Sequence, residues 1–325
     1  MNKPIKRIGV LTSGGDAPGM NAAIRAVVRG CLYRGIECVG IRRGYNGLIN
    51  GDILRMDAGT VTHIINRGGT ILYTARSDEF RTEEGQLRAA ATCKLLGLDG
   101  IVAIGGDGTF RGAEALAKTG VSVVGVPATI DNDIACTDYT IGFDTASNTA
   151  VDAIDRLRDT MQSHERCSVV EVMGRNAGHL ALYVGLAVGA TAVLMPELPM
   201  DFDRDVVEKI RRARLAGKTH FMIVVAEGAG KAIEIGEQIH EELGLDPRVT
   251  ILGHIQRGGT PTARDRVMAT RMGYTAVEVL LAGKTNRVIC SQHGSMVDVD
   301  IEEGLSMKKG LNQQQCDALA AMTGL

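Results

Sequence analysis

The residue types with the clearest capacity for chemistry lie in the segment 127–133, where one threonine and two aspartates stand two residues apart. A β-branched run, 121–126, precedes the segment, and we expect a buried strand that ends at the proline. If the following chain is extended, Thr129, Asp131 and Asp133 point to one side and the two intervening residues to the other. Such a set can take a proton from a substrate alcohol and help to organise a magnesium ion. The same residue types also make turns and cap helices, so the segment alone leaves both interpretations open.

A glycine-rich turn follows the first expected strand, 7–12, and precedes an expected helix, 20–34. The turn reads Ser13-Gly-Gly-Asp-Ala-Pro-Gly19. This arrangement aims backbone N–H groups and a helix N-terminus at an anion. The dinucleotide fingerprint is absent, and the next strand, 38–41, ends in two arginines rather than in an acid that would hold a ribose. A turn that serves packing alone is equally consistent with this pattern.

A second turn of the same build, Gly105-Gly-Asp-Gly-Thr109, follows the apolar strand 101–104 and precedes an expected helix, 110–118. Gly106 and Gly108 let phosphate oxygens approach the backbone, and Thr109 could cap the helix while it donates to a phosphate. Asp107 would repel a phosphate unless a cation lies between them, so the pattern predicts Mg²⁺. Because carboxyl ends of neighbouring parallel strands meet, we expect the two glycine turns to line one crevice.

Arginines form the next notable feature, because several stand at strand beginnings or just past strand ends instead of on helix faces. Guanidinium groups are the usual partners of phosphate monoesters, although each of these arginines alone is more often structural. Together with one histidine and one glutamate they could hold a phosphorylated, hydroxyl-rich substrate. The set comprises Arg166, Arg175, Arg248, Arg257, His254 and Glu227.

The composition indicates a globular α/β protein. The length of 325 residues predicts about two domains, and strands alternate with helices through residues 146–281, which is typical of parallel α/β layers. Aromatic residues make up 3% with no tryptophan, and the net charge is −2. Both features argue against a nucleic-acid platform or a membrane-surface field, so we expect neither kind of partner.

The seven cysteines include no Cys-x-x-Cys pair, and this predicts neither a zinc site nor a disulfide framework. The apolar run 8–11 is too short for a signal peptide, and no stretch approaches the length of a membrane span. The expectation is a cytoplasmic protein.

Five sequence blocks, taken in order, resemble those of the bacterial ATP-dependent 6-phosphofructokinases over essentially the whole chain. The blocks are Ser13 to Arg25, Gly105-Gly-Asp-Gly108, Thr129-Ile-Asp-Asn-Asp133, Glu171-Val-Met-Gly-Arg175 and Gly253-His-Ile-Gln-Arg-Gly-Gly259. The resemblance implies an enzyme that uses ATP and Mg²⁺ to phosphorylate the 1-hydroxyl of fructose 6-phosphate, as a homotetramer with active sites shared across subunits.

The resemblance also implies the fold and the division of the chain. The expected fold class is α/β, with two Rossmann-like three-layer α/β domains and mainly parallel sheets. Residues 1–142 and 256–306 would form the ATP-binding domain. Residues 143–255 and 307–325 would form the fructose 6-phosphate-binding domain.

The family motifs assign roles by position. Asp131 matches the general base, Asp133 the supporting acid near the metal, and Asp107 the magnesium ligand. Arg76, Thr129 and Arg175 match the groups that stabilise the migrating phosphoryl. The ATP-binding positions match Gly15, Tyr45, Arg76, Ser77, Arg81, Gly106, Asp107, Gly108 and Thr109. The sugar-phosphate positions match Thr129, Ile130, Asp131, Met173, Gly174, Arg175, Glu227, His254, Ile255, Gln256 and Arg257, with Arg166 and Arg248 reaching in from a neighbouring subunit.

Two positions bear on the phosphoryl donor. Pyrophosphate-using relatives carry an aspartate at the position of Gly108 and a lysine at that of Ala128, so Gly108 favours ATP. Ala128 also departs from the usual glycine of the ATP enzymes. The alternatives are a pyrophosphate-dependent enzyme, or a regulator that binds nucleotide or sugar phosphate without turnover.

The effector site follows the family pattern only in part. Matching positions for an ADP or phosphoenolpyruvate effector are Arg25, Arg29, Arg158, Lys218 and His220. The charged residues usual nearby are replaced by Ala58, His63, Thr191, Ala216 and Thr219. Fewer phosphate and metal contacts reduce the difference in effector affinity between two states, so we expect weak or unusual allostery.

Overall fold

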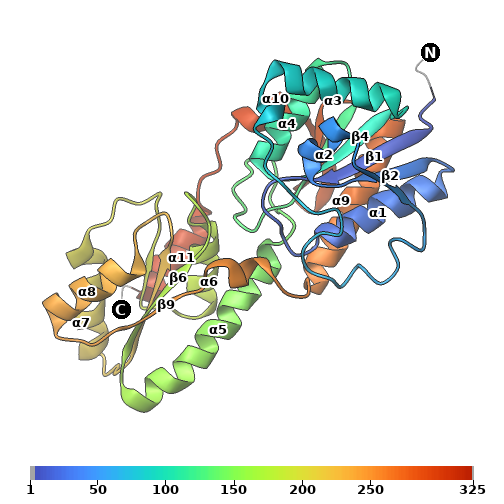
Figure 1. Ribbon diagram of the computed structural model, residues 1–325. Helices are drawn as coiled ribbons and strands as arrows, with labels where there is room; N and C mark the ends of the chain where they lie inside the picture. The colour runs from blue at the N-terminus through green and yellow to red at the C-terminus, as the bar shows by residue number, and fades with distance from the viewer. Residues whose placement is uncertain (1–3, 324–325) are drawn as a thin grey trace. The chain divides into compact units, whose positions relative to one another are not determined.

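The computed structural model describes residues 4–323, which form two compact units, each built from three separate stretches of chain (Figure 1). Unit 1 comprises residues 4–129, Ile134–Thr145 and Arg257–Lys309. Unit 2 comprises Ile130–Asp133, Ala146–Gln256 and residues 310–323. The loop that carries Asp131 therefore leaves unit 1 after Thr129 and returns to it at Ile134. Within residues 4–323, no helix is long and apolar enough to span a membrane.

Unit 1 is organised around a seven-stranded sheet in the order β11-β10-β5-β4-β1-β2-β3. Its central five strands are parallel, and only the edge strands β3 and β11 pair antiparallel with their neighbours. The strands are β1 (Arg7–Thr12), β2 (Glu37–Ile41), β3 (Ile53–Met56), β4 (Gly100–Gly105), β5 (Val123–Pro127), β10 (Arg287–Gln292) and β11 (Ser295–Asp300). All residues of β4 and β5 are buried, as their apolar sequences require in the middle of a parallel sheet.

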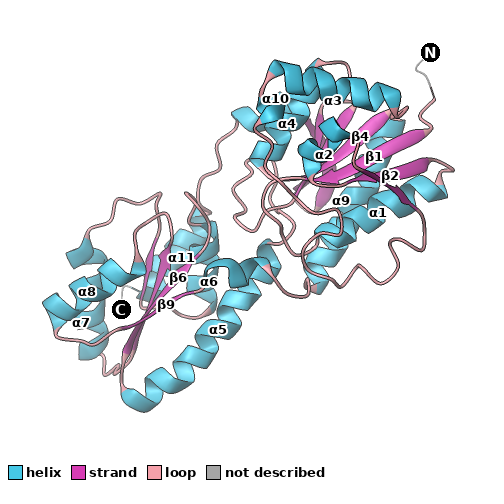
Figure 2. Cartoon of the chain, viewed as in Figure 1, coloured by secondary structure: helices cyan, strands magenta, loops and turns pink. Residues whose placement is uncertain are grey.

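Helices cover both faces of this sheet (Figures 1 and 2). On one face, Leu11 and Ile101 of the sheet pack with Leu48, Phe110 and Leu116 of the helices in one apolar core. On the other face, α1 and α9 lie side by side (Figure 1). The helices are α1 (Met20–Tyr33), α2 (Gly44–Asn50), η1 (Glu79–Arg81), α3 (Glu83–Leu95), α4 (Asp107–Lys118), α9 (Ala263–Leu281) and α10 (Ile301–Ser306).

Unit 2 contains a smaller, fully parallel sheet in the order β7-β8-β6-β9. Its strands are β6 (Cys167–Val172), β7 (Ala192–Leu194), β8 (Phe221–Ala226) and β9 (Arg248–Ile251). Val169 and Ile223 of this sheet pack with Ile210 and Ile239 of the flanking helices. The helices are α5 (Phe143–His164), α6 (His179–Ala187), η2 (Asp203–Val207), α7 (Glu208–Leu215), α8 (Ala232–Leu243) and α11 (Gln313–Thr323), while η3 (Gly253–Arg257) leads back to unit 1.

The predicted fold class, α/β with mainly parallel sheets between helices, is confirmed. Most predicted elements agree with the structure within one to three residues. Helix α7 is preceded directly by a π-helical turn, η2. The sequence patterns predict no element at α2, β3, α6, the hairpin β10–β11, α10 or α11. β11 has no fully buried residue, so its sequence lacks the apolar run by which the central strands were found.

Candidate active site

The two glycine turns of unit 1 lie side by side at the carboxyl ends of β1 and β4. These strands are parallel neighbours, with Val10 opposite Val102 and Thr12 opposite Ile104. The turns are joined directly, because the Ser13 N–H donates to the carbonyl of Ile104 at 3.0 Å and the Thr109 hydroxyl donates to the carbonyl of Ser13 at 3.0 Å. The prediction that the two turns are neighbours is confirmed.

Two glycines of the second turn differ in the space available for a side chain. A Cβ on Gly105 would lie 2.4 Å from the Ser13 carbonyl oxygen and 2.3 Å from the Thr109 hydroxyl, so packing between the turns excludes any side chain there. A Cβ on Gly108 would meet nothing within 4 Å. The space above Gly108 is therefore open, and no packing contact explains the missing side chain.

Helix α4 starts three residues earlier than predicted, at Asp107. The expectation that Thr109 caps this helix is wrong. The N-cap is Gly106, and the Thr109 hydroxyl instead donates to the carbonyl of Ser13. The reason is that the extended backbone of Gly106 already turns the chain into the helix. Asp107 and Gly108 thus form the first turn of α4, where backbone N–H groups lack helical partners and favour an anion.

Tyr45 lies beneath this turn and is buried. Its hydroxyl donates to the carbonyl of Thr109 at 2.6 Å, and its ring stacks on Phe80 with centroids 4.2 Å apart. The ring also fills the space beside Gly112, where a Cβ would approach it to 2.5 Å. Burial raises the pKa of Tyr45 well above its ordinary value, so the hydroxyl stays protonated and donating. These contacts position the start of α4, and direct contact with ATP stays a prediction.

The other predicted ATP residues of unit 1 lie in the chain between β3 and α3. The Ser77 hydroxyl accepts from the Phe80 N–H at 3.2 Å and fixes the start of η1. Arg81 is exposed and pairs with Asp78 at 3.6 Å, an ion pair that contributes little in water. Arg76 is exposed and makes no ion pair with any residue between 4 and 323.

Asp131 and Arg175 are brought together within unit 2. The carboxyl group of Asp131 is 1% exposed, and its Oδ2 lies 3.4 Å from Nε of Arg175. The Arg175 side chain itself is 59% exposed, so part of the guanidinium faces solvent while one edge faces the buried carboxylate. A buried acid with a charged donor beside it can act on a substrate hydroxyl and stabilise developing negative charge.

Arg175 reaches this position through an unusual backbone conformation. Its φ is +54°, in the left-handed region, and the preceding Gly174 has φ +141°. Oε1 of Glu227 accepts hydrogen bonds from the N–H groups of both residues, at 3.1 Å from Gly174 and 2.6 Å from Arg175. Gly228 completes the fit, because a Cβ there would lie 2.2 Å from the Arg175 carbonyl oxygen. Glu227 thus holds the backbone that presents Arg175.

The chain at 129–133 is not extended, so the condition for alternating side chains is not met. Residues 130 and 131 form a turn, and Asn132 is in the left-handed region with φ +51°. Side chains therefore do not alternate: the neighbours Ile130 and Asp131 are both buried, while Asp133 is half-buried. The physical reason is that an asparagine tolerates this conformation and reverses the chain after Asp131.

The block 253–259 is divided between the two units. In unit 2, buried Gln256 accepts from the Met173 N–H at 2.8 Å, so it ties the end of β6 to this block. His254 and Ile255 are exposed. In unit 1, Nη1 of Arg257 donates to the carbonyl of Asp16 at 3.1 Å and covers Gly15, where a Cβ would lie 2.5 Å from that nitrogen. Arg257 therefore lies on the first glycine turn.

The remaining predicted sugar-phosphate residues are at the surface of unit 2. Arg166 is half-buried immediately before β6. Arg248 starts β9 and is exposed, with an ion pair to Asp246 at 3.1 Å. Within residues 4–323, neither arginine forms a salt bridge with Asp131.

The donor set can accommodate a magnesium ion without a preformed cage. Within residues 4–323, no three His, Cys, Asp or Glu side chains cluster as metal ligands. Mg²⁺ is usually bound through one or two carboxylates, with substrate phosphates and water completing the octahedron. A half-buried Asp107, on a helix N-terminus with open space above Gly108, fits that mode of binding.

Comparison with known families accounts for this combination of turns and charges. The family model for Phosphofructokinase matches residues 7–280. The chain belongs to the phosphofructokinase family. A relative from Clostridium botulinum, named ATP-dependent 6-phosphofructokinase, is 55% identical over 313 residues, covering 96% of this chain and 98% of that protein. A relative from Clostridium perfringens, named ATP-dependent 6-phosphofructokinase 1, is 57% identical over 309 residues, covering 95% and 97%.

Solved phosphofructokinase structures share the fold. That of Saccharomyces cerevisiae matches with a TM-score of 0.86 and 33% identity, over 98% of this chain and 46% of that chain. That of Pichia pastoris matches with a TM-score of 0.90 and 34% identity, over 99% of this chain and 40% of that chain. The chain thus spans less than half the length of each of these two fungal chains.

The predicted effector residues of this phosphofructokinase fall on both units. Arg25 and Arg29 lie on α1 in unit 1, half-buried and exposed respectively. In unit 2, Arg158 donates to the carbonyl of Val188 and so caps the C-terminus of α6. Thr191 is buried, and its hydroxyl accepts from the Met222 N–H at 3.3 Å. This hydroxyl is hydrogen-bonded within the sheet, and a threonine has no carboxylate with which to bind the metal of an effector.

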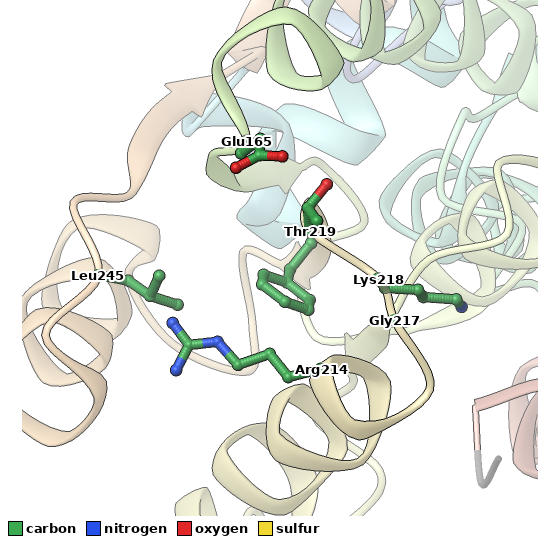
Figure 3. Close-up of a pocket in the computed structure, with 7 residues that line it drawn as sticks. Glu165, Arg214, Gly217, Lys218, Thr219 and Leu245 are labelled. Atoms are coloured by element: carbon green, nitrogen blue, oxygen red, sulfur yellow. The ribbon is translucent and has the colours of Figure 1, made fainter.

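A pocket of about 330 Å³ adjoins Lys218, the predicted effector residue on the loop before β8 (Figure 3). Arg214 lies over the ring of Phe221 at 5.8 Å on one side of the pocket, and Glu165 lies across from it. Figure 3 shows the Lys218 side chain pointing away from both of these charged residues. His220, just beyond the pocket, is half-buried.

Proposed function

We propose that the chain is an ATP-dependent 6-phosphofructokinase, which transfers the γ-phosphoryl of ATP to the 1-hydroxyl of D-fructose 6-phosphate to give fructose 1,6-bisphosphate and ADP. The observation that carries the proposal is the 55% identity, over 96% of the chain, with a relative named for this activity. The residues that phosphoryl transfer requires, a buried carboxylate, guanidinium groups and phosphate-binding turns, occur in the same chain.

ATP binds to unit 1 at the paired glycine turns. Gly15, Gly106 and Gly108 let the phosphates approach backbone N–H groups, and the first turn of α4 favours their charge. Arg76 and Arg81, both exposed, bring positive charge to the phosphates, and Ser77 lies between them. Asp107 holds Mg²⁺, which when bound neutralises the phosphate charge and orients the nucleotide.

Asp131 acts as the general base that takes the proton from the 1-hydroxyl of the sugar. The adjacent Arg175, with Thr129 and Arg76, stabilises the charge on the migrating phosphoryl group. Asp133 supports the site as a second acid. Little covalent chemistry is asked of the protein, because positioning and charge neutralisation supply most of the catalysis in this class of reaction.

Fructose 6-phosphate binds to unit 2, where its phosphate meets guanidinium and imidazole groups. Met173, Gly174 and Glu227 line the sugar, and Gln256 fixes the adjacent backbone. His254 and Ile255 contact the phosphate, and Arg257, which belongs to unit 1, is the further phosphate contact that the family motif predicts. Arg166 and Arg248 complete the site from a neighbouring subunit of a homotetramer. Sedimentation velocity tests the tetramer, and loss of fructose 6-phosphate affinity on dilution to monomer tests the shared site.

Regulation by ADP or phosphoenolpyruvate is weak in this chain. Thr191 supplies a hydroxyl that is bonded to the sheet, and Arg158 is bonded to a helix end. An effector that binds at Arg25, Arg29, Lys218 and His220 therefore makes few contacts that could differ between two states. Titration of each effector to millimolar concentration, with fructose 6-phosphate below half saturation, tests this. A severalfold change in rate would contradict it.

ATP is the donor because the space above Gly108 is open. An acid at that position would repel the inner phosphates of a nucleotide. Ala128, in place of the glycine of related ATP enzymes, is not among the non-glycine residues with positive φ, so its side chain imposes no backbone strain.

A coupled assay with fructose 6-phosphate and Mg²⁺, run in parallel with ATP and with pyrophosphate, tests the proposal. We expect turnover with ATP and a rate at least a hundredfold lower with pyrophosphate. Preferential use of pyrophosphate would overturn the choice of donor. Binding of both substrates without turnover would establish the regulator instead.

A further inference from the structure

A buried carboxylate outside the residues discussed above holds a loop of unit 1 in place. Asp265, in the first turn of α9, has no exposed surface. Its Oδ1 accepts from the Tyr139 hydroxyl at 2.5 Å and the Gly142 N–H at 2.7 Å. Its Oδ2 accepts from the Thr145 N–H at 2.8 Å and the Thr145 hydroxyl at 2.5 Å. All four donors belong to the segment 139–145.

The segment 139–145 in turn supports the end of β5 and the residues after it. The Ile141 N–H donates to the carbonyl of Pro127 at 3.0 Å, and Ala128 and Ile141 form an isolated parallel bridge. The Thr140 hydroxyl donates to the carbonyl of Thr129 at 2.7 Å. Hydrogen bonds at both ends of the short segment 139–145 therefore connect Asp265 to the backbone of Pro127 and Thr129.

Further contacts at the start of α9 hold Asp265 and the segment 139–145 in place. Thr262 caps α9 by accepting from the Asp265 N–H at 3.3 Å, and the Thr262 hydroxyl donates to Asp144 at 2.7 Å. The guanidinium of Arg264 lies 4.7 Å from the centroid of the Tyr139 ring. Burial raises the pKa of Asp265 above its ordinary value, although the hydrogen bonds from Thr145, Tyr139 and Gly142 oppose that shift. Because two donors face each oxygen of Asp265, the surroundings of this side chain require two acceptor oxygens.

We infer that Asp265 is a positioning residue for phosphoryl transfer, which sets the backbone of residues 127–129 through the segment 139–145. The inference rests on the proposed function, in which Thr129 and Asp131 act on the substrate. Reacting groups must be held within a fraction of an ångström, and a misplacement of about 1 Å can lower the rate roughly 10²-fold. Asp265 touches no reacting atom and acts only through this loop.

Asp265→Asn is the sharpest variant because it keeps the shape of the side chain. One oxygen becomes an NH₂ group, which must face either the Gly142 N–H or the Thr145 N–H. A hydroxyl can turn to accept a hydrogen bond, but a backbone N–H cannot. In either orientation the segment 139–145 must therefore shift.

The matched control is Val277→Ala, a fully buried change on the same helix that packs against α1 at Gly30. We expect both variants to lower Tm. Only Asp265→Asn should lower kcat, by roughly 10²-fold, while KM for ATP stays within about threefold. Hydrogen–deuterium exchange should rise at residues 127–133 in Asp265→Asn and not in Val277→Ala.

Thr140→Val serves as a second variant in case Asp265→Asn does not fold, since it removes the link to Thr129 without disturbing the buried charge. It should lower kcat about tenfold, and the double variant should lose less than the product of the two single losses. The inference is overturned if Asp265→Asn, or Thr140→Val where the former is unfolded, keeps more than half of wild-type kcat. It is also overturned if kcat falls equally in Val277→Ala at equal Tm loss. Absence of turnover in the wild type would instead overturn the proposed function.

Discussion

Oδ2 of Asp131 lies 3.4 Å from Nε of Arg175, and the carboxyl group is buried while most of the arginine is exposed. The pair joins the loop after β5 to the turn after β6, two segments more than forty residues apart in the chain. A carboxylate in this setting can accept a proton from an alcohol, and the arginine can follow the charge that moves onto the phosphoryl group.

Asp131→Ser should lower kcat by roughly 10²–10⁴-fold, the usual contribution of a positioned base. Affinity for ATP should be nearly unchanged, because the glycine turns that we propose to bind ATP belong to unit 1 and Asp131 belongs to unit 2. Steady-state kinetics with each substrate varied in turn provide the measurement. Asp57→Ser, at an exposed position of unit 1, is the control and should behave as wild type. Near-wild-type turnover in Asp131→Ser would remove Asp131 from the role of base.

Replacement of Glu227 by glutamine should lower activity far less than replacement by alanine. Both backbone hydrogen bonds that hold Gly174 and Arg175 go to Oε1, and a glutamine can supply the same acceptor. Glu227→Gln should therefore keep kcat within about tenfold, whereas Glu227→Ala should lose roughly 10²-fold or more because Arg175 is no longer held. Equal losses in the two variants would show that the charge of Glu227, and not its support of the backbone, matters.

Gly108→Asp should weaken the use of ATP without harming the fold. The side chain enters open space and lies in the first turn of α4, where an acid is stabilised by about 0.3–1 kcal/mol. Tm should hold or rise while kcat/KM for ATP falls at least tenfold through repulsion of the phosphates. Gly108→Ala is the matched control: it adds a methyl group without a charge and should lower kcat/KM for ATP much less than Gly108→Asp does. An equal loss in Gly108→Ala would point to backbone conformation instead of charge.

The buried thiols should resist alkylation in the native protein. Burial raises the pKa of Cys93 and of Cys167 to about 12, so at pH 8 both remain protonated and the reactive thiolate is scarce. Cys316 on α11 is half-exposed, although burial raises its pKa as well. Iodoacetamide followed by peptide mass spectrometry should label Cys316 first. Labelling of Cys93 or Cys167 at the same rate would show that their cores open locally.

The central strands and the glycine turns could be predicted from the sequence because local rules determine them. An apolar run such as Ile101–Ile104 must be buried on both faces, and a glycine turn that follows it must lie at the carboxyl end of the sheet. The neighbourhood of the two turns then follows from strand pairing. Edge elements such as β11 lack this periodic signal, because their side chains are only partly buried.

The details of the site depended on contacts between distant segments, and these the sequence did not reveal. Asn132 reverses the chain after Asp131, so the side chains at 129–133 do not alternate as they would in an extended loop. The spacing Thr262-x-x-Asp265 has the form of a helix capping box, and Thr262 does cap α9. The carboxylate of Asp265 nevertheless accepts hydrogen bonds from Tyr139, Gly142 and Thr145, which only the folded structure brings next to it.

The identity of the product tests the central claim most directly. The protein is incubated with fructose 6-phosphate, ATP and Mg²⁺, and the products are followed by ³¹P nuclear magnetic resonance. We predict a new phosphate ester at C1 of the sugar, formed at the rate at which ADP appears, with both signals appearing roughly 10²–10⁴-fold more slowly in Asp131→Ser. ADP and free phosphate without a second ester on the sugar, or no change in either substrate, would contradict it.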